Sequence, residues 1–115
     1  MAGGSPDPEV GRALAVLHAR PAEPWTLDEL AGEVGLSRST LAQRFTDFVG
    51  EPPIHYLANW RIQLAARQLA DGKAKVLSVE RDVGYESEAA FSRAFKKLVG
   101  ESPAAWRRRT ESLQP

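Results

Sequence analysis

The chain has 115 residues, enough for one compact domain or two small lobes, and it contains no cysteine. A disulfide framework, a thiol nucleophile and a cysteine-ligated zinc site are therefore excluded. No apolar run approaches membrane-spanning length and the N-terminus has no signal-peptide pattern, so we expect a cytoplasmic protein that does not engage a membrane.

The formal net charge is zero, but the charges are unevenly distributed along the chain. Residues 1–36 hold six acidic and two basic side chains, a balance of −4, whereas residues 37–115 hold nine acidic and thirteen basic side chains, a balance of +4. A basic region steers a protein toward phosphates even when its total charge is zero. The charge pattern is therefore compatible with a nucleic-acid partner.

The first predicted element is a helix from Pro8 to about Arg20. Residues 1–6 precede it and are expected to be a flexible N-terminal segment. Asp7 can act as the N-cap of the helix, and Pro8 suits its first position. The apolar stripe of this helix is formed by Val10, Ala13, Leu14 and Leu17.

Residues 26–50 predict a helix-turn-helix unit. Thr26 precedes a short apolar helical pattern that ends at Gly35, a residue suited to a left-handed helix terminus. Ser37 then caps a second helix, which Gly50 ends. Two helices joined by a short glycine-containing turn form the unit whose second helix enters the DNA major groove. The inward face of that second helix is predicted to consist of Leu41, Phe45 and Phe48.

An internal repeat fixes the rest of the architecture. Pro52-Pro53 opens a long helix that reaches about Ala70, and we interpret residues 51–72 as a linker helix. Residues 76–103 then match residues 27–53, at an offset of 49 positions before the turn and 50 after it. A second helix-turn-helix unit is therefore predicted, with Ser87 in the place of Ser37, Gly100 in the place of Gly50, and Phe91, Phe95 and Leu98 inward.

These elements predict an all-α fold of about seven helices and no strand. The last helix begins with Ser102 as cap and Pro103 at its first position, and Trp106 is expected to fold back on the second lobe. The predicted organisation comprises the N-terminal segment, a first subdomain at 7–50, the linker helix, a second subdomain at 73–109 and a frayed tail at 110–115.

The arrangement resembles the DNA-binding domain of the AraC/XylS family of bacterial transcription regulators, over about residues 8 to 109. The most specific part is residues 84–97, Gly-Tyr-Glu-Ser-Glu-Ala-Ala-Phe-Ser-Arg-Ala-Phe-Lys-Lys, with Gly100 and Pro103 following. The resemblance implies sequence-specific binding of double-stranded DNA and regulation of transcription. One departure is Glu80, which matches Ala31 at a position where the family usually has a small residue.

The resemblance also implies partners. Most members of the family carry an effector-binding or dimerisation domain beside this one, so the chain is interpreted either as an excised domain or as a small stand-alone member that binds DNA as a monomer. RNA polymerase is a second candidate partner. No cofactor and no metal are expected.

The second helix of each helix-turn-helix unit, residues 37–49 and residues 87–99, is called its reading helix. The residues opposite the inward pattern form an outward face on each reading helix. We expect the two reading helices to lie in adjacent major grooves. Gln43 can make two hydrogen bonds with adenine, and Arg93 with guanine. The base-reading candidates are Ser39, Ala42, Gln43 and Thr46 on the first helix, and Ala89, Ala90 and Arg93 on the second. The phosphate-binding candidates are Ser37, Arg38, Ser87, Lys96, Lys97 and Arg107.

Each assignment has an alternative. Gln43 can be ordinary helix surface, Arg93 can pair internally with Glu88 or Asp82, and the arginine run 107–109 can be a solvated helix end. A helical module that contacts the transcription machinery without reading DNA is the alternative function, and it would require apolar outward faces. An enzyme is not expected, because the sequence shows no nucleophile–base pair, phosphate loop or metal-ligand spacing.

Overall fold

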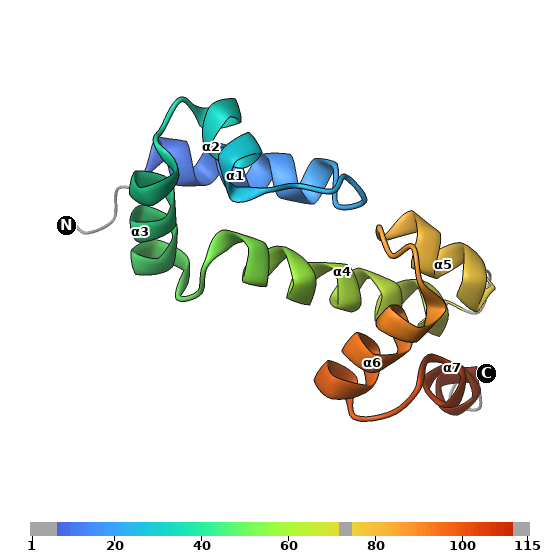
Figure 1. Cartoon of the computed structure of the whole chain (residues 1–115). Coiled ribbons are helices and arrows are strands. Elements are labelled where there is room, and N and C mark those ends of the chain that lie inside the picture. The colour runs from blue at the N-terminus through green and yellow to red at the C-terminus, as the bar shows by residue number, and fades with distance from the viewer. Residues whose placement is uncertain (1–6, 72–74, 112–115) are drawn as a thin grey trace. The chain divides into compact units, whose positions relative to one another are not determined.

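The structure is a computed structural model that describes residues 7–71 and 75–111, apart from the side chain of Leu77. The predictions made for residues 1–6, 72–74 and 112–115 lie outside the described residues. The described residues contain no strand, which confirms the all-α prediction. Residues 7–71 and 75–111 contain seven helices, which Figure 1 shows: α1 (Pro8–Ala19), α2 (Leu27–Val34), α3 (Arg38–Val49), α4 (Pro53–Ala70), α5 (Val76–Asp82), α6 (Glu88–Val99) and α7 (Pro103–Glu111).

The chain divides into two compact units, unit 1 (Met1–Ala58) and unit 2 (Asn59–Pro115). The division falls inside α4, so this helix contributes to both cores. Leu57 of α4 is buried in the core of unit 1, whereas Ile62 and Leu69 are buried in the core of unit 2. The assignment of residues 51–72 to a separate linker segment remains a prediction.

Unit 1 is built from α1, α2 and α3, which pack on one another. Val10, Ala13 and Leu17 recur at helical spacing on α1 and are fully buried, so this stripe faces the core. Trp25 closes the core from the loop before α2 and donates its indole N–H to the Arg20 carbonyl oxygen at 3.0 Å. The other buried residues of this core are Leu30, Ala31, Val34, Leu41, Phe45 and Leu57.

Local hydrogen bonds fix the start and end of α2. Thr26 accepts the backbone N–H of Glu29 at 3.1 Å, and the Glu29 carboxylate accepts the backbone N–H of Thr26 at 3.2 Å. This reciprocal capping box satisfies two amide groups that the helix itself cannot bond. Gly35 then ends the helix with φ of 74°, a left-handed conformation that side chains disfavour. The orientation of the chain into α3 is thus set by a few residues.

Unit 2 repeats the three-helix arrangement, including a counterpart of α1 that was not recognised from the sequence. Ile62, Ala65 and Leu69 on α4 have the same spacing as the buried stripe of α1, and all three are buried. The later part of α4 therefore takes the role that α1 has in unit 1. The remaining buried residues of this core are Val79, Val83, Phe91 and Phe95.

The last helix packs on unit 2 through one tryptophan, as predicted. Trp106 meets Phe95 edge-on with ring centroids 6.4 Å apart and donates its indole N–H to the Ala66 carbonyl oxygen at 2.9 Å. The helix continues through Thr110 and Glu111, which had been assigned to the tail. Thr110 contributes by donating its hydroxyl to backbone carbonyl oxygens of the preceding turn.

The prediction that Phe48 and Leu98 point inward is wrong. Their exposed fractions are 54% and 46%, and neither belongs to a core cluster. The buried line of each reading helix instead follows the i, i+4, i+8 positions, which brings Val49 and Val99 against the cores. At about 100° per residue, Phe48 and Leu98 lie about 100° from Val49 and Val99, the residues of the last helical turn that pack against the cores.

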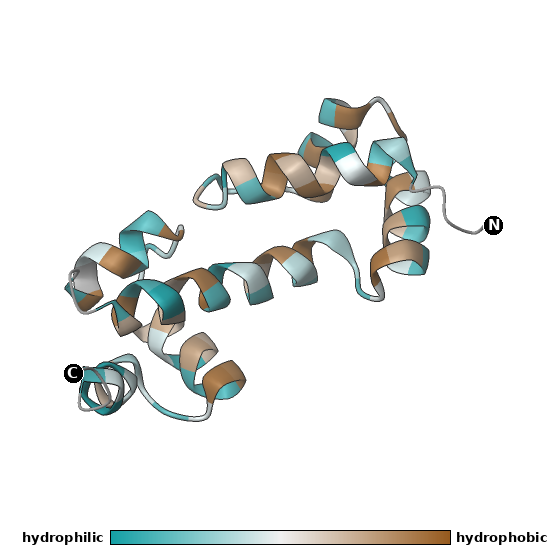
Figure 2. Cartoon of the chain, turned by 180° about the vertical axis from the view of Figure 1, so that it is seen from behind, coloured by the Kyte–Doolittle hydropathy of each residue, from teal (hydrophilic) through white to brown (hydrophobic). Residues whose placement is uncertain are grey.

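Hydrophobic and hydrophilic residues are interspersed along the helices (Figure 2), as expected for helices that bury one face and expose the other. Within the described ranges, no helix combines the length and the apolar character needed to cross a membrane. The buried apolar residues of these helices form the two cores, whereas Phe48, Ile54 and Leu98 are exposed.

Candidate nucleic-acid interface

The two reading helices, α3 and α6, begin with the same serine cap. Ser37 Oγ accepts the backbone N–H of Thr40 at 3.2 Å, and Ser87 Oγ accepts that of Ala90 at 3.2 Å. Both serines are exposed, and Ser37 also donates its hydroxyl to Thr40 Oγ1 at 2.8 Å. Each serine therefore lies at the positive end of a helix dipole, where an anion is stabilised.

On α3 the predicted base-reading residues lie on the side away from the core. Leu41 and Phe45 are fully buried. Ser39, Gln43 and Thr46 are exposed, and Ala42 beside them is partly buried. Gln43 makes no hydrogen bond from its side chain within the described part of the chain, so its amide is available for a paired contact with a base.

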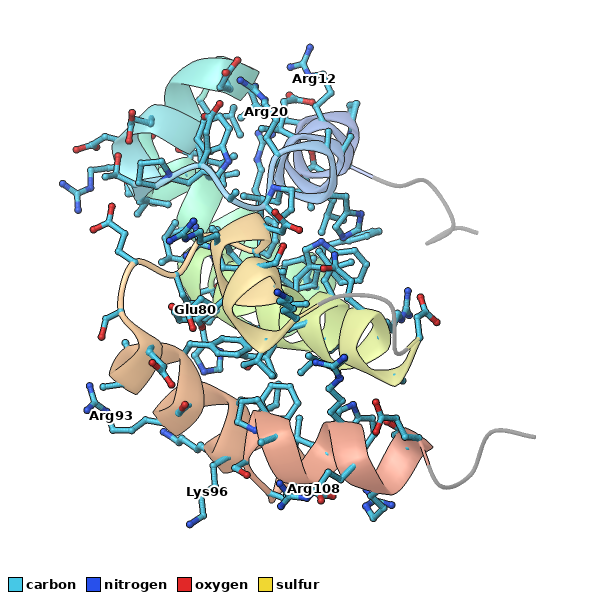
Figure 3. The ribbon with its side chains drawn as sticks, turned by 90° about the vertical axis from the view of Figure 1, so that its right-hand side faces the viewer. Arg12, Arg20, Glu80, Arg93, Lys96 and Arg108 are labelled. Atoms are coloured by element: carbon cyan, nitrogen blue, oxygen red, sulfur yellow. The ribbon has the colours of Figure 1, made fainter. Side chains whose placement is uncertain are left out.

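On α6 the corresponding face carries a cation in place of an amide. Ala89 and Arg93 are exposed and Ala90 is partly buried. Arg93 forms no ion pair among residues 7–71 and 75–111, so the alternative in which it pairs with Glu88 or Asp82 is not observed. Figure 3 shows the Arg93 side chain projecting away from the helix into solvent.

The predicted phosphate-binding cations differ in how they are held. Arg38 Nε lies 3.6 Å from Asp28 Oδ1, with both side chains about two-thirds exposed, and such a surface ion pair is weak. Lys96 and Lys97 are exposed and have no ion-pair partner in the described ranges. Lys96 extends into solvent in Figure 3. The two lysines are thus the more accessible cations.

The arginine run on α7 separates into three different environments. Arg107 Nε lies 3.4 Å from Glu111 across one helical turn. Arg109 is held on two sides, by a 2.8 Å hydrogen bond from its Nε to Glu101 Oε2 and by the Trp106 ring, whose centroid lies 5.0 Å from its guanidinium carbon. The hydrogen bond with Glu101 raises the pKa of Arg109. Arg108 is exposed and has no partner within the described residues.

Every basic side chain of unit 1 is engaged by a partner. Unit 1 has four arginines and no lysine. Besides Arg38, Arg12 donates to the Val34 carbonyl oxygen at 2.9 Å. The remaining ion pairs are Arg20 with Glu23 at 3.1 Å and Glu33 at 2.9 Å, and Arg44 with Glu9 at 3.4 Å and Asp7 at 3.8 Å.

Arg61 is a structural residue of unit 2. Its guanidinium carbon lies 6.0 Å from the centroid of the Tyr85 ring. Burial lowers the pKa of Arg61 and raises the pKa of Tyr85, and the charge of Arg61 partly opposes the shift of the tyrosine. The described residues contain no cluster of three or more His, Asp or Glu side chains that could hold a metal ion.

Sequence comparison identifies a family and several relatives. The family model described as a helix-turn-helix domain matches residues 30–109. A putative AraC-like transcription regulator from Streptomyces lividans is 50% identical over 105 residues, which cover 91% of this chain and 34% of the relative. The transcriptional regulator AlkR from Acinetobacter baylyi is 40% identical over 103 residues, covering 90% and 34%. The chain thus spans about a third of the length of these relatives.

Solved structures share the fold. The C-terminal domain of AraT, a response regulator from Geobacillus stearothermophilus, has a TM-score of 0.85 and 30% identity, with 90% of this chain and 86% of that chain covered. The DNA-binding domain of AdpA in complex with a target DNA has a TM-score of 0.87 and 27% identity, with 93% and 96% covered. The fold of the chain is therefore similar to the folds of these two domains.

Proposed function

The chain belongs to the AraC-type helix-turn-helix family of transcription regulators, and we propose that it binds double-stranded DNA sequence-specifically as the DNA-binding part of such a regulator. The observation that carries this proposal is the matched pair of exposed polar faces on α3 and α6, each opposite a buried aromatic core and each beginning at an exposed serine cap. The similar AdpA domain in complex with a target DNA supports it.

We assign reading of bases to the outward faces. Gln43 offers an amide that pairs with adenine, and Arg93 offers a guanidinium that pairs with guanine. Ser39, Ala42, Thr46, Ala89 and Ala90 contribute smaller contacts, the methyl groups of threonine and alanine being suited to the thymine methyl. The phosphate set remains Ser37, Arg38, Ser87, Lys96, Lys97 and Arg107.

We further propose that the chain acts as a monomer in the bacterial cytoplasm, that it has no catalytic activity of its own, and that its regulator contacts RNA polymerase. The protein-interaction module that does not read DNA is not favoured. Its outward faces would have to be apolar, whereas Gln43 and Arg93 occupy them. The function of the whole regulator includes whatever effector or dimerisation domain accompanies this part.

Selection of bound duplexes from a random pool, with this chain alone, tests the proposal. We expect enrichment of one asymmetric sequence motif. A double variant, Gln43→Ala with Arg93→Ala, is the control, because both side chains are exposed and their loss leaves the cores intact. It should retain its circular dichroism spectrum and lose the enrichment. A pool that stays random with the unmodified chain would contradict the proposal.

A further inference from the structure

The two units have opposite net charge. Unit 1 contains four basic and eight acidic residues, a balance of −4, and unit 2 contains eleven basic and seven acidic residues, a balance of +4. The phosphate backbone dominates DNA affinity through its negative charge. Unit 1, with its excess of acidic residues, therefore contributes little to the electrostatic attraction to phosphates, even if its outward face contacts bases.

The ion pairs sharpen this difference. The four arginines of unit 1 each have a partner within the unit, so a phosphate has to compete with an existing contact. In unit 2, by contrast, seven exposed cations make no ion pair in the described ranges. Three of them, Arg67, Lys75 and Arg81, lie on or beside α4 and α5. The other four lie on α6 and α7, and they are Arg93, Lys96, Lys97 and Arg108.

Arg108 comes from a different helix than the other three. The helices α6 and α7 are packed together through the ring contact of Phe95 with Trp106. At about 100° per residue, Arg108 lies about 200° around α7 from Trp106 and therefore faces solvent, whereas Arg109 lies on the side of the tryptophan. Figure 3 shows Arg93, Lys96 and Arg108 all projecting away from the core of unit 2.

We propose that unit 2 is the phosphate anchor of the chain and that Arg108 on α7 binds a DNA phosphate together with Lys96 and Lys97 on α6. This inference rests on the DNA-binding function proposed above. It adds a residue that was not assigned from the sequence. It also excludes Arg109, because this arginine is already satisfied by Glu101 and Trp106. Unit 1 then contributes mainly base reading, through an α3 face whose neighbouring arginines are internally paired.

The salt dependence of nonspecific binding tests the inference, because this binding depends on phosphates alone. The probe is a fluorescent random-sequence duplex of about three helical turns, and anisotropy is followed between about 50 and 200 mM KCl. Arg108→Ala should flatten the slope of log affinity against log salt by about 0.9, the value for one phosphate contact. Arg108→Lys should keep the slope of the unmodified chain.

Arg109→Ala is the matched control, since it removes the same charge from the same helix. It should change the slope by less than half as much as Arg108→Ala. Thermal unfolding of each variant verifies folding, and Arg108→Gln repeats the test with an uncharged polar side chain. An unchanged slope for Arg108→Ala, or an equal change for Arg109→Ala, overturns the inference. Failure of the unmodified chain to bind the duplex overturns the proposed function itself.

Discussion

Glu80 occupies in unit 2 the position that Ala31 occupies in unit 1, and both residues are buried, with exposed fractions of 4% and 3%. The two positions are therefore equally shielded from water, but one holds a carboxylic acid side chain and the other a methyl group. Glu80 Oε2 has no hydrogen-bond partner within the described part of the chain. Figure 3 shows Glu80 among the packed side chains of unit 2. A buried polar atom without a partner reduces the stability of the fold.

Replacing Glu80 by alanine is expected to stabilise unit 2. The substitution removes one methylene group, which costs about 0.8 kcal/mol. It also removes a buried carboxyl group, whose unsatisfied burial costs about 1–3 kcal/mol or more when the group is charged. We therefore expect a net gain of about 1 kcal/mol in the free energy of unfolding, measured by urea denaturation followed by tryptophan fluorescence.

Two further variants separate the causes. Glu80→Gln keeps the shape and removes the carboxylate, so it should give part of the gain. Ala31→Glu places a carboxylate in the equivalent site of unit 1 and should destabilise the chain. A loss of stability in Glu80→Ala would mean that the carboxylate has a compensating contact in solution.

The helix boundaries could be predicted because they are local. The side-chain oxygens of Thr26, Ser37 and Ser87 each accept a hydrogen bond from the backbone N–H three residues later. The start of each of these helices therefore depends on residues that are close in the sequence. The outward face of each reading helix could be predicted for the same reason. Once Phe45 and Phe95 are known to be buried, helical geometry fixes which residues lie on the opposite side. Caps and helical spacing carry their information within a few residues.

What could not be predicted depends on distant neighbours. Phe48 has the helical spacing of a core residue, but in the last turn of α3 it is Val49 that packs against the core, and Phe48 is 54% exposed. The availability of Arg108 depends on Glu101 and Glu111, which engage its two neighbours. One signal was present in the sequence: Arg107 and Glu111 are four residues apart, the spacing of an ion pair on a helix.

The stability of the chain should decrease at alkaline pH in part through Tyr85. Burial raises the pKa of Tyr85 above its ordinary value of 10.0, so the folded state holds the proton more tightly than the unfolded state. The stability from this group is complete below pH 10 and is lost as the pH rises through the folded pKa. Chemical denaturation at a series of pH values should show a smaller alkaline decrease for Tyr85→Phe. Parallel curves for the two proteins would exclude this contribution.

The affinity of the unmodified chain for its selected site should fall steeply with salt. If six to ten phosphates are neutralised, the slope of log affinity against log salt should be roughly −5 to −9. Lys97→Ala should flatten it by about one and weaken all sequences alike, because Lys97 is exposed and unpaired in the described ranges. An unchanged slope would place Lys97 away from the backbone.

One chain should occupy one site. Because the two reading helices differ in sequence, the site should be asymmetric, with a length of about two helical turns. Analytical ultracentrifugation of the chain with a duplex of that length should give a one-to-one complex at low concentration. A palindromic selected site, or a complex that forms only with two chains, would contradict the monomeric arrangement.

The central claim is that each unit reads its own part of one DNA site, and binding of Gln43→Ala and Arg93→Ala to sites randomised in one half at a time tests it most directly. Each variant should lose about 1–3 kcal/mol on the best site and relax base preference in one half only, the two halves being different. The losses should nearly add in the double variant, because the two side chains lie in different units and neither has a side-chain partner among the described residues. Equal weakening of every sequence by either variant, or loss of preference in the same half by both, would contradict the account.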